Sequence, residues 1–145
     1  MAFVYFDSSV LVAMALGVAR CSQAMAIVGR RDSCTSTLSP LECQAGLSFQ
    51  CAAAPGGLPA AEQALDALLN RIYIIQLTFP VLLQARTLVR RHRVGIGLRT
   101  LDAIHVASCA EIRAQVAGGA VEYITGDRRQ HLAFTSEGFS GSLLA

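Results

Sequence analysis

Four acidic residues stand where a carboxylate could bind a metal ion or take part in catalysis: Asp7, Glu42, Asp102 and Asp127. Asp7 ends the apolar run 2–6, and Asp127 closes the run 121–126, so both follow segments typical of buried strands. In an open parallel sheet, ligands bind at the carboxyl ends of the strands. Acids gathered there form a dense negative site, which is costly unless a cation fills it.

The chemistry of this acidic set favours a hard cation. Oxygen ligands without supporting Cys or His spacing are typical of Mg²⁺ or Mn²⁺ sites. Each acid also has a local explanation, because Asp7 could cap the next helix and Glu42 occupies the fourth position of a capping box that begins at Ser39. Asp102 suits the dipole at a helix start, and Asp127 could be a turn residue. We favour the functional interpretation for the first three, and for Asp127 alone both stay open.

Several neighbouring residues could assist the acids. His105 lies one turn beyond Asp102 and could orient a carboxylate or contact substrate, although a hydrogen-bonded helix histidine is the more common role. All twelve basic residues are arginines, which genome composition explains, yet arginine also suits bidentate phosphate contacts. Arg128 and Arg129 directly follow Asp127. The basic run 90–93 is more typical of a solvated helix end than of a nucleic-acid patch.

Strand-like and helix-like segments alternate along the chain. Strands are predicted over 2–6, 33–37, 71–77 and 121–125, and helices over 10–28, 40–54, 60–70, 79–93 and 99–117. The Pro/Gly-rich stretch 55–59 is a loop between helices, and the remainder through 144 should form a short helix and a weak edge strand. This alternation predicts an α/β fold, a three-layer sandwich with a mainly parallel central sheet of about four to five strands.

Length and composition narrow the class of protein. With 145 residues, we expect a single domain spanning 1–145. The chain is 53% hydrophobic and only 15% charged, which suggests an apolar surface patch that awaits a partner. The longest clean apolar stretch, 10–19, is too short to span a bilayer, and the N-terminal pattern is not that of a signal peptide.

The five cysteines point to a reducing compartment. Their number is odd and they follow no CxxC or other metal-binding spacing. We therefore expect them to behave as small buried hydrophobic residues, in a protein of the cytoplasm.

Four segments together resemble the PIN-domain family of metal-dependent nucleases, and within it the VapC-type toxins of bacterial toxin–antitoxin pairs. The matching segments are Phe6-Asp7-Ser8-Ser9-Val10-Leu11, Ser39-Pro40-Leu41-Glu42, the run from Leu98 to Ala107 around Asp102, and Thr125-Gly126-Asp127-Arg128-Arg129. Each segment alone is weak, but their order and spacing across nearly the whole chain make the match fairly specific.

The resemblance implies a Mg²⁺- or Mn²⁺-dependent ribonuclease, an antitoxin that blocks its site, and a homodimer. The family's acidic positions carry over to Asp7, Glu42, Asp102 and Asp127, and its hydroxyl to Ser8 or Ser9. We expect Asp7, Asp102 and Asp127 to be the metal ligands, direct or through water. Glu42 could bind a second ion or orient the attacking water. Ser8, Ser9 and Thr125 are expected to support the acids, and Arg99, Arg128 and Arg129 to hold RNA phosphates.

Other classes of protein fit less well. A haloacid-dehalogenase-like phosphatase needs a second Asp where Ser9 stands and also a lysine, and a receiver domain needs a lysine too, whereas this chain has none. A catalytically weak PIN-like module for protein interaction stays open as the alternative. The four acids argue against it, since a pure scaffold gains nothing from packed like charges.

Overall fold

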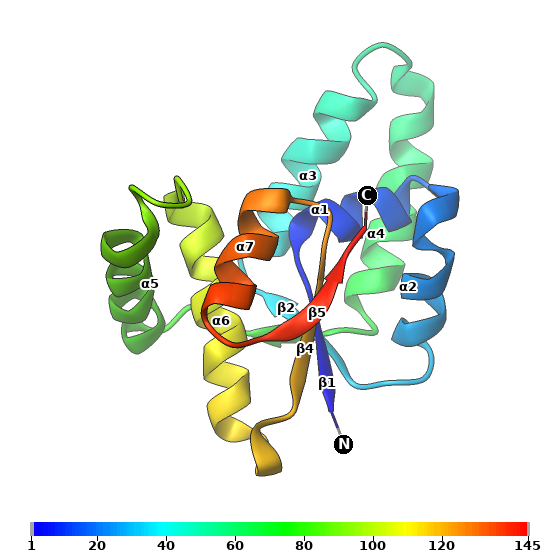
Figure 1. The fold of residues 1–145 in the computed structure, drawn as a ribbon. Helices are drawn as coiled ribbons and strands as arrows, with labels where there is room; N and C mark the ends of the chain where they lie inside the picture. The colour runs from blue at the N-terminus through cyan, green and yellow to red at the C-terminus, as the bar shows by residue number, and fades with distance from the viewer. Residues whose placement is uncertain (1, 145) are drawn as a thin grey trace.

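A five-stranded sheet forms the centre of the computed structural model, which describes residues 2–144 (Figure 1). The strands are β1 (Phe3–Phe6), β2 (Ser33–Ser36), β3 (Tyr73–Ile75), β4 (Val121–Thr125) and β5 (Ser140–Leu143), in the order β3-β2-β1-β4-β5. Every pair of neighbours is parallel, so helical crossovers return the chain between strands. This confirms the predicted α/β class and the predicted edge strand.

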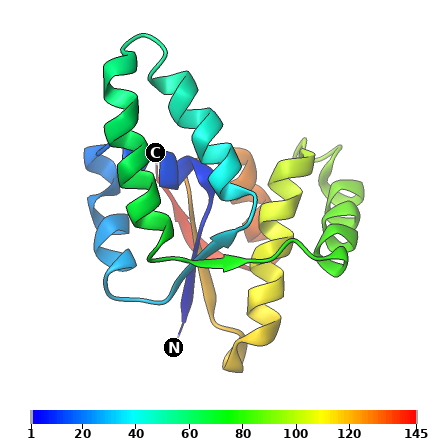
Figure 2. The ribbon, with the colours of Figure 1, turned by 180° about the vertical axis from the view of Figure 1, so that it is seen from behind.

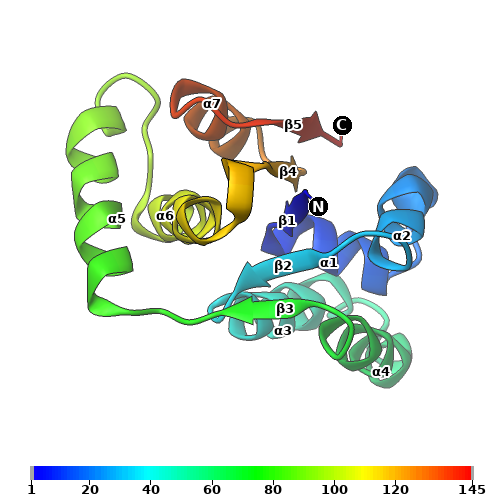
Figure 3. The ribbon, with the colours of Figure 1, turned by 90° about the horizontal axis from the view of Figure 1, so that it is seen from below.

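Helices cover both faces of the sheet. They are α1 (Ser8–Ala15), α2 (Ser22–Val28), α3 (Ser39–Gln50), α4 (Leu58–Leu69), α5 (Phe79–His92), α6 (Thr100–Gln115) and α7 (Arg128–Ser136), with short 3₁₀ turns η1 (Ala19–Cys21), η2 (Pro55–Gly57) and η3 (Ala117–Gly119). Seen from below, α1 to α4 lie on one side of the sheet and α6 and α7 on the other, with α5 outside α6 (Figure 3). The α3–α4 hairpin projects beyond the carboxyl ends of the strands (Figures 1 and 2).

Two hydrophobic cores hold these layers together, one on each face of the sheet. Successive residues of β1 point to opposite faces, so Val4 and Phe6 pack against α1 to α4, whereas Tyr5 packs against α6 and α7. All three are almost completely buried. Burial on both faces explains why β1 is an unbroken apolar run rather than an alternating one.

The segment predicted as one helix over 10–28 is broken in the structure. Gly17 has a φ of 69°, a left-handed conformation that residues with a Cβ rarely adopt, and α1 ends just before it. The chain then turns by 116° into α2. In the described part of the chain, no single helix is long and apolar enough to cross a membrane, and only this bent pair reaches the required length and composition together.

The cysteines follow the expectation from their spacing. All five are buried and free of disulfides. Burial raises the pKa of Cys34 to about 12, and burial together with the charges of Glu42 and Asp7 raises that of Cys43 to about 12. Both thiols therefore stay protonated near neutral pH and pack as small hydrophobic groups.

The direction in which the chain adds strands to the sheet reverses at the centre of the sheet. From β1 the chain builds outward through β2 and β3, and then returns to add β4 and β5 on the other side. The reversal lies between β1 and β4, whose register sets Phe6 opposite Ile124. The residues that follow, Asp7 and Thr125, therefore meet at the point where ligands bind in open α/β sheets.

Replacing Gly141 with alanine tests the placement of the edge strand β5. A Cβ at Gly141 would overlap the backbone oxygen of Tyr123 and lie 2.5 Å from its ring carbon Cδ1. We expect Gly141→Ala to cost about 1–3 kcal/mol and to lower the melting temperature by roughly 3–10 °C in thermal unfolding. Gly56→Ala is the control, because a Cβ there meets no atom within 4 Å. Equal melting temperatures for both variants would contradict the β4–β5 pairing.

Candidate active site at the carboxyl ends of the central strands

The Asp7 carboxylate is buried at the junction of β1 and α1, with the residue only 1% exposed. One oxygen, Oδ1, accepts hydrogen bonds from Ser9 Oγ at 2.7 Å and from the backbone N–H of Val10 at 3.2 Å. The other, Oδ2, accepts a short bond from Thr125 Oγ1 across the β1–β4 pair. Asp7 thus caps α1 and joins the two strands at the reversal point. Ser9 and Thr125 hold its two oxygens by hydrogen bonds.

Burial makes the charge on Asp7 expensive. It raises the pKa of the carboxyl above its ordinary value of 3.8, although the charge of His105 and the three hydrogen bonds act in the opposite direction. Among residues 2–144, no arginine forms an ion pair with Asp7. A buried carboxylate that no arginine neutralises is the kind of group that marks a functional site.

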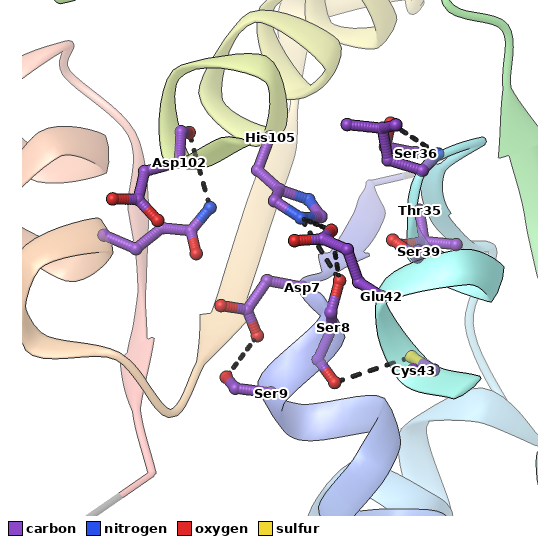
Figure 4. A network of polar contacts seen from close by, with 12 residues as sticks. Asp7, Ser8, Ser9, Thr35, Ser36, Ser39, Glu42, Cys43, Asp102 and His105 are labelled. Carbon is purple, nitrogen blue, oxygen red and sulfur yellow. Dashed lines mark hydrogen bonds and ion pairs between the residues drawn. The ribbon is translucent and has the colours of Figure 1, made fainter. Parts of the chain in front are cut away.

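Glu42 belongs to a polar chain that runs from the sheet to α3 (Figure 4). Its Oε1 accepts a hydrogen bond from Ser8 Oγ at 2.7 Å and lies 2.6 Å from His105 Nε2. Burial opposes ionisation, but these bonds and the imidazole charge outweigh it, so the pKa of Glu42 lies below its ordinary value of 4.5. Glu42 is therefore ionised, and Nε2 donates to it.

His105 is held from its other side by Tyr5. The Tyr5 hydroxyl lies 2.7 Å from Nδ1, and burial raises the pKa of this phenol well above its ordinary value, so it stays protonated. When the imidazole is neutral, Nε2–H donates to Glu42 while Nδ1 accepts from Tyr5; when it is charged, Nδ1–H faces the Tyr5 oxygen instead. His105 is only 2% exposed. Of its two possible roles, the structure supports the orientation of a carboxylate over contact with substrate.

The start of α3 differs from the capping box predicted at Ser39. The Ser39 side chain makes no cap; its hydroxyl lies 2.6 Å from Thr35 Oγ1, which in turn donates to the Phe6 carbonyl at 2.6 Å. Since Thr35 has only one proton to donate, Ser39 is the donor in their pair. This buried chain fixes the first turn of α3 to the end of β1, and it leaves the Glu42 side chain free to face Ser8 and His105.

Asp102 does form the capping interaction at the start of α6. Its Oδ2 accepts from the Arg99 backbone N–H at 3.2 Å and from Arg99 Nε at 3.4 Å, and it lies 3.8 Å from Arg129 Nη1. The side chain is 11% exposed. Local capping and a role in the site are therefore compatible at this position.

Asp127 is the N-cap of α7. Its Oδ1 accepts from the backbone N–H groups of Arg129 at 2.7 Å and Gln130 at 3.2 Å, while Oδ2 lies 3.9 Å from Arg99 Nη2. The Asp127 N–H donates to Thr125 Oγ1 at 3.0 Å, which links this acid through one hydroxyl to Asp7. Asp7, Asp102 and Asp127 thus all lie at helix starts, where the backbone dipole favours negative charge.

Polar contacts connect Asp7, Asp127 and Asp102, whereas Glu42 belongs to a separate group with Ser8, His105 and Tyr5, and the four acids do not form a ready-made metal cluster. Within residues 2–144, no three His, Cys, Asp or Glu side chains approach closely enough to hold one ion. Arginines stand between the acids instead, because Arg99 contacts both Asp102 and Asp127 and Arg129 contacts Asp102. The donor set itself suits Mg²⁺ or Mn²⁺, since it consists of carboxylate and hydroxyl oxygens.

The three arginines predicted to hold RNA phosphates differ in their surroundings. Arg99 and Arg129 flank the acids, with side chains 63% and 37% exposed. Arg128 is exposed in the first turn of α7, and the described residues give it no ion pair. The polar contacts of Tyr5 and Thr35 were not predicted, because the apolar or strand-like sequence around each residue gives no sign of them.

The raised pKa of Asp7 predicts that the wild-type protein is less stable than it could be at neutral pH. The stability that this carboxyl contributes is complete below pH 3.8 and is lost as pH rises through its higher folded-state pKa. Asp7→Asn should therefore melt at a higher temperature than the wild type at pH 7, with a smaller difference at pH 4. Thermal unfolding at both pH values measures this. Asp66→Asn, at an exposed position on α4, should change neither value. A lower melting temperature for Asp7→Asn at pH 7 would contradict the burial of an unpaired charge.

Several solved structures share this fold. VapBC2 from Rickettsia felis, bound to a DNA fragment from its promoter, has a TM-score of 0.68 at 13% identity and covers 99% of each chain. VapC20 from Mycobacterium tuberculosis, a sarcin–ricin loop cleaving toxin, has a TM-score of 0.63 at 22% identity, covering 94% of this chain and 95% of that one. A toxin–antitoxin complex from Klebsiella pneumoniae has a TM-score of 0.61 at 19% identity and covers 86% of each.

At such low identities these structures establish the shared fold and nothing further. Comparison with curated proteins gives no match. The family model described as PIN domain matches residues 4–133, which include all four acids of the site. The chain therefore belongs to the PIN domain family.

Proposed function

We propose that this protein is a Mg²⁺- or Mn²⁺-dependent endoribonuclease and the toxin of a toxin–antitoxin pair. The observation that carries the proposal is the buried carboxylate of Asp7 at the reversal point of the sheet, in a PIN-family chain, connected by hydrogen bonds and ion pairs to Asp127 and Asp102. A metal ion there would neutralise charge on the scissile phosphate and make a water nucleophilic.

The four acids would have different roles in such a site. Asp7, Asp102 and Asp127 would hold the ion, and Glu42, fixed by Ser8 and His105, would orient the attacking water or a second ion. Asp7 and Glu42 carry no arginine contact among the described residues, and the arginine side chains reach Asp102 and Asp127 at Oδ2 only.

The arginines must move when a cation enters. Their contacts with Asp102 and Asp127 are 3.4–3.9 Å long and Arg99 is largely exposed, so exchanging them costs little, about 0–1 kcal/mol per pair. Once released, Arg99, Arg128 and Arg129 are placed to bind phosphates of the RNA by charge-assisted hydrogen bonds.

The surface supports a protein partner. Phe79, Leu82 and Leu83, within about one turn of α5, expose large hydrophobic side chains, and exposed apolar surface commonly marks an interaction site. One of the neighbours described above is a toxin–antitoxin complex, and another is VapBC2. We therefore expect a small antitoxin that covers the acidic site, a homodimer of this chain, and action in the cytoplasm.

RNA cleavage with and without chelator tests the nuclease. We expect purified protein to cut RNA in Mg²⁺ or Mn²⁺, EDTA to abolish cleavage, and Asp7→Asn to reduce the rate by at least about 100-fold, because the ion loses a ligand and its charge complement. Asp66→Asn, matched in chemistry but exposed on α4, should cleave like the wild type. Cleavage that resists EDTA, or that persists in Asp7→Asn, would contradict the metal-dependent mechanism. No cleavage by folded wild-type protein, measured on gels with mixed RNA, would favour the weak interaction module.

Expression in bacteria tests the toxin assignment. Production of this protein alone should slow growth, and co-expression with the small open reading frame beside its gene should restore growth and give a complex that co-purifies. Asp7→Asn should leave growth normal while still binding the partner. Normal growth with soluble, RNA-cleaving wild-type protein would leave the nuclease intact and remove the toxin role.

A further inference from the structure

Two open pockets adjoin the acidic site, and Glu42 lines both. One, of about 480 Å³, lies between α1 and α3 and reaches from Ser8 and Ser9 to Phe49. The other, of about 490 Å³, lies on the α6 side and contains Asp102. A chain-like ligand crossing Glu42 would therefore enter one pocket on each side. We call them the α3 pocket and the α6 pocket.

The α3 pocket offers an aromatic ring to solvent. Phe49 is 81% exposed although it lies close to the site, and Gln50 and Arg20 also line this pocket. Glu42, Gly46 and Phe49 lie on one face of α3, because residues three or four apart in a helix are neighbours. Gly46 leaves room beside the ring, and a Cβ there would be 3.0 Å from the Val12 side chain. Phe49 stands about 10 Å from Glu42 along the helix axis.

The α6 pocket contains arginines beside the acids. Arg93 and Arg99 line it, together with Thr100 and Leu101. The basic run 90–93 lies at the exposed end of α5, as the sequence predicts, and Arg93 at that end also lines this pocket. Guanidinium groups of this kind suit phosphate oxygens.

The two pockets offer different chemistry to one ligand. An exposed aromatic ring stacks on any nucleobase, and a neighbouring amide can hydrogen-bond to the base edge. In a duplex the faces of a base are covered by its neighbours, so only an unpaired nucleotide can present one to Phe49. Arginine on the far side then meets the backbone of the same strand. An apolar protein segment would match Phe49, but it would leave Arg20 and Glu42 in the same pocket without partners.

We propose that the α3 pocket binds an unpaired base of single-stranded RNA, stacked on Phe49 next to the scissile phosphate, while Arg93 and Arg99 in the α6 pocket hold the strand's backbone. This inference rests on the proposed ribonuclease function and assigns the contact with one base of the substrate to Phe49. Phe49 is then a determinant of substrate specificity, on a hairpin that projects beyond the carboxyl ends of the strands (Figure 2).

Binding of a labelled RNA to the cleavage-deficient Asp7→Asn protein tests the proposal. We expect single-stranded RNA to bind more tightly than a duplex of the same sequence. Phe49→Ala should weaken single-strand binding by roughly 5- to 150-fold, the range for loss of one stacked base, and Phe49→Trp should restore it. Phe79→Ala is the matched control, since Phe79 is 71% exposed but lies outside both pockets, and it should bind like its parent. Arg93→Ala should reduce the slope of log affinity against log salt by about 0.7.

Cleavage assays in the otherwise wild-type background separate the two possible failures. Suppose that the wild-type protein cuts RNA, and that Phe49→Ala cuts and binds single-stranded RNA as well as Phe79→Ala does. The assignment of the α3 pocket is then overturned, while the proposed nuclease function is not. The same holds if Phe49→Ala weakens single-strand and duplex binding equally, or weakens only binding of the antitoxin. If wild-type protein neither binds nor cuts RNA, both proposals fail. Because Phe49 is exposed, melting temperatures of all variants should match their parents.

Discussion

The hydrogen bond between Thr125 and Asp7 joins the two strands on which the whole site depends. It forms because the β1–β4 register places the ends of both strands side by side, and it holds a carboxylate where almost no water reaches. The same Thr125 oxygen accepts the Asp127 N–H, so one hydroxyl sets the positions of two acids. Any slip in this pairing would turn Thr125 to the opposite face of the sheet and separate them.

Three of the four candidate carboxylates also cap helices. Asp7, Asp102 and Asp127 each accept backbone N–H groups at the start of a helix, which helps to fix their positions. At Asp102 and Asp127 the capping bonds use one carboxylate oxygen, so the other can face the site. Glu42 is the exception: its helix begins without a side-chain cap, and Ser8 and His105 orient it instead. Helix capping is therefore compatible with the metal-binding role proposed for these three residues.

The sequence was sufficient for the α/β class and for most strands and helices, since these depend on local pattern. Apolar runs followed by Asp predict the ends of β1 and β4, and ligands of open α/β sheets bind at such ends. The sequence was insufficient where one tertiary contact or one backbone conformation decides. The predicted cap at Ser39 is wrong because Thr35, buried on β2 four residues earlier, accepts its hydroxyl hydrogen bond. The helix predicted over 10–28 is wrong because Gly17 turns left-handed, an event that a strongly apolar stretch does not reveal. The apolar context of Tyr5 predicts a core residue, and its ring does pack in the core. Only the fold shows that its hydroxyl reaches His105, 100 residues away.

Arginines neutralise some carboxylates of the site but not others, and this difference indicates where a cation is needed. Arg99 and Arg129 neutralise Asp102 and Asp127 from exposed positions, where such pairs are weak and easily exchanged. Asp7 receives only hydroxyls and a backbone N–H, so its burial remains uncompensated by any arginine among residues 2–144. A structure built for stability alone would place a neutral side chain here. Under the proposed function, the carboxylate at the reversal point of the sheet would bind a metal ion, and the exposed arginines would move from the acids to the phosphates of the RNA.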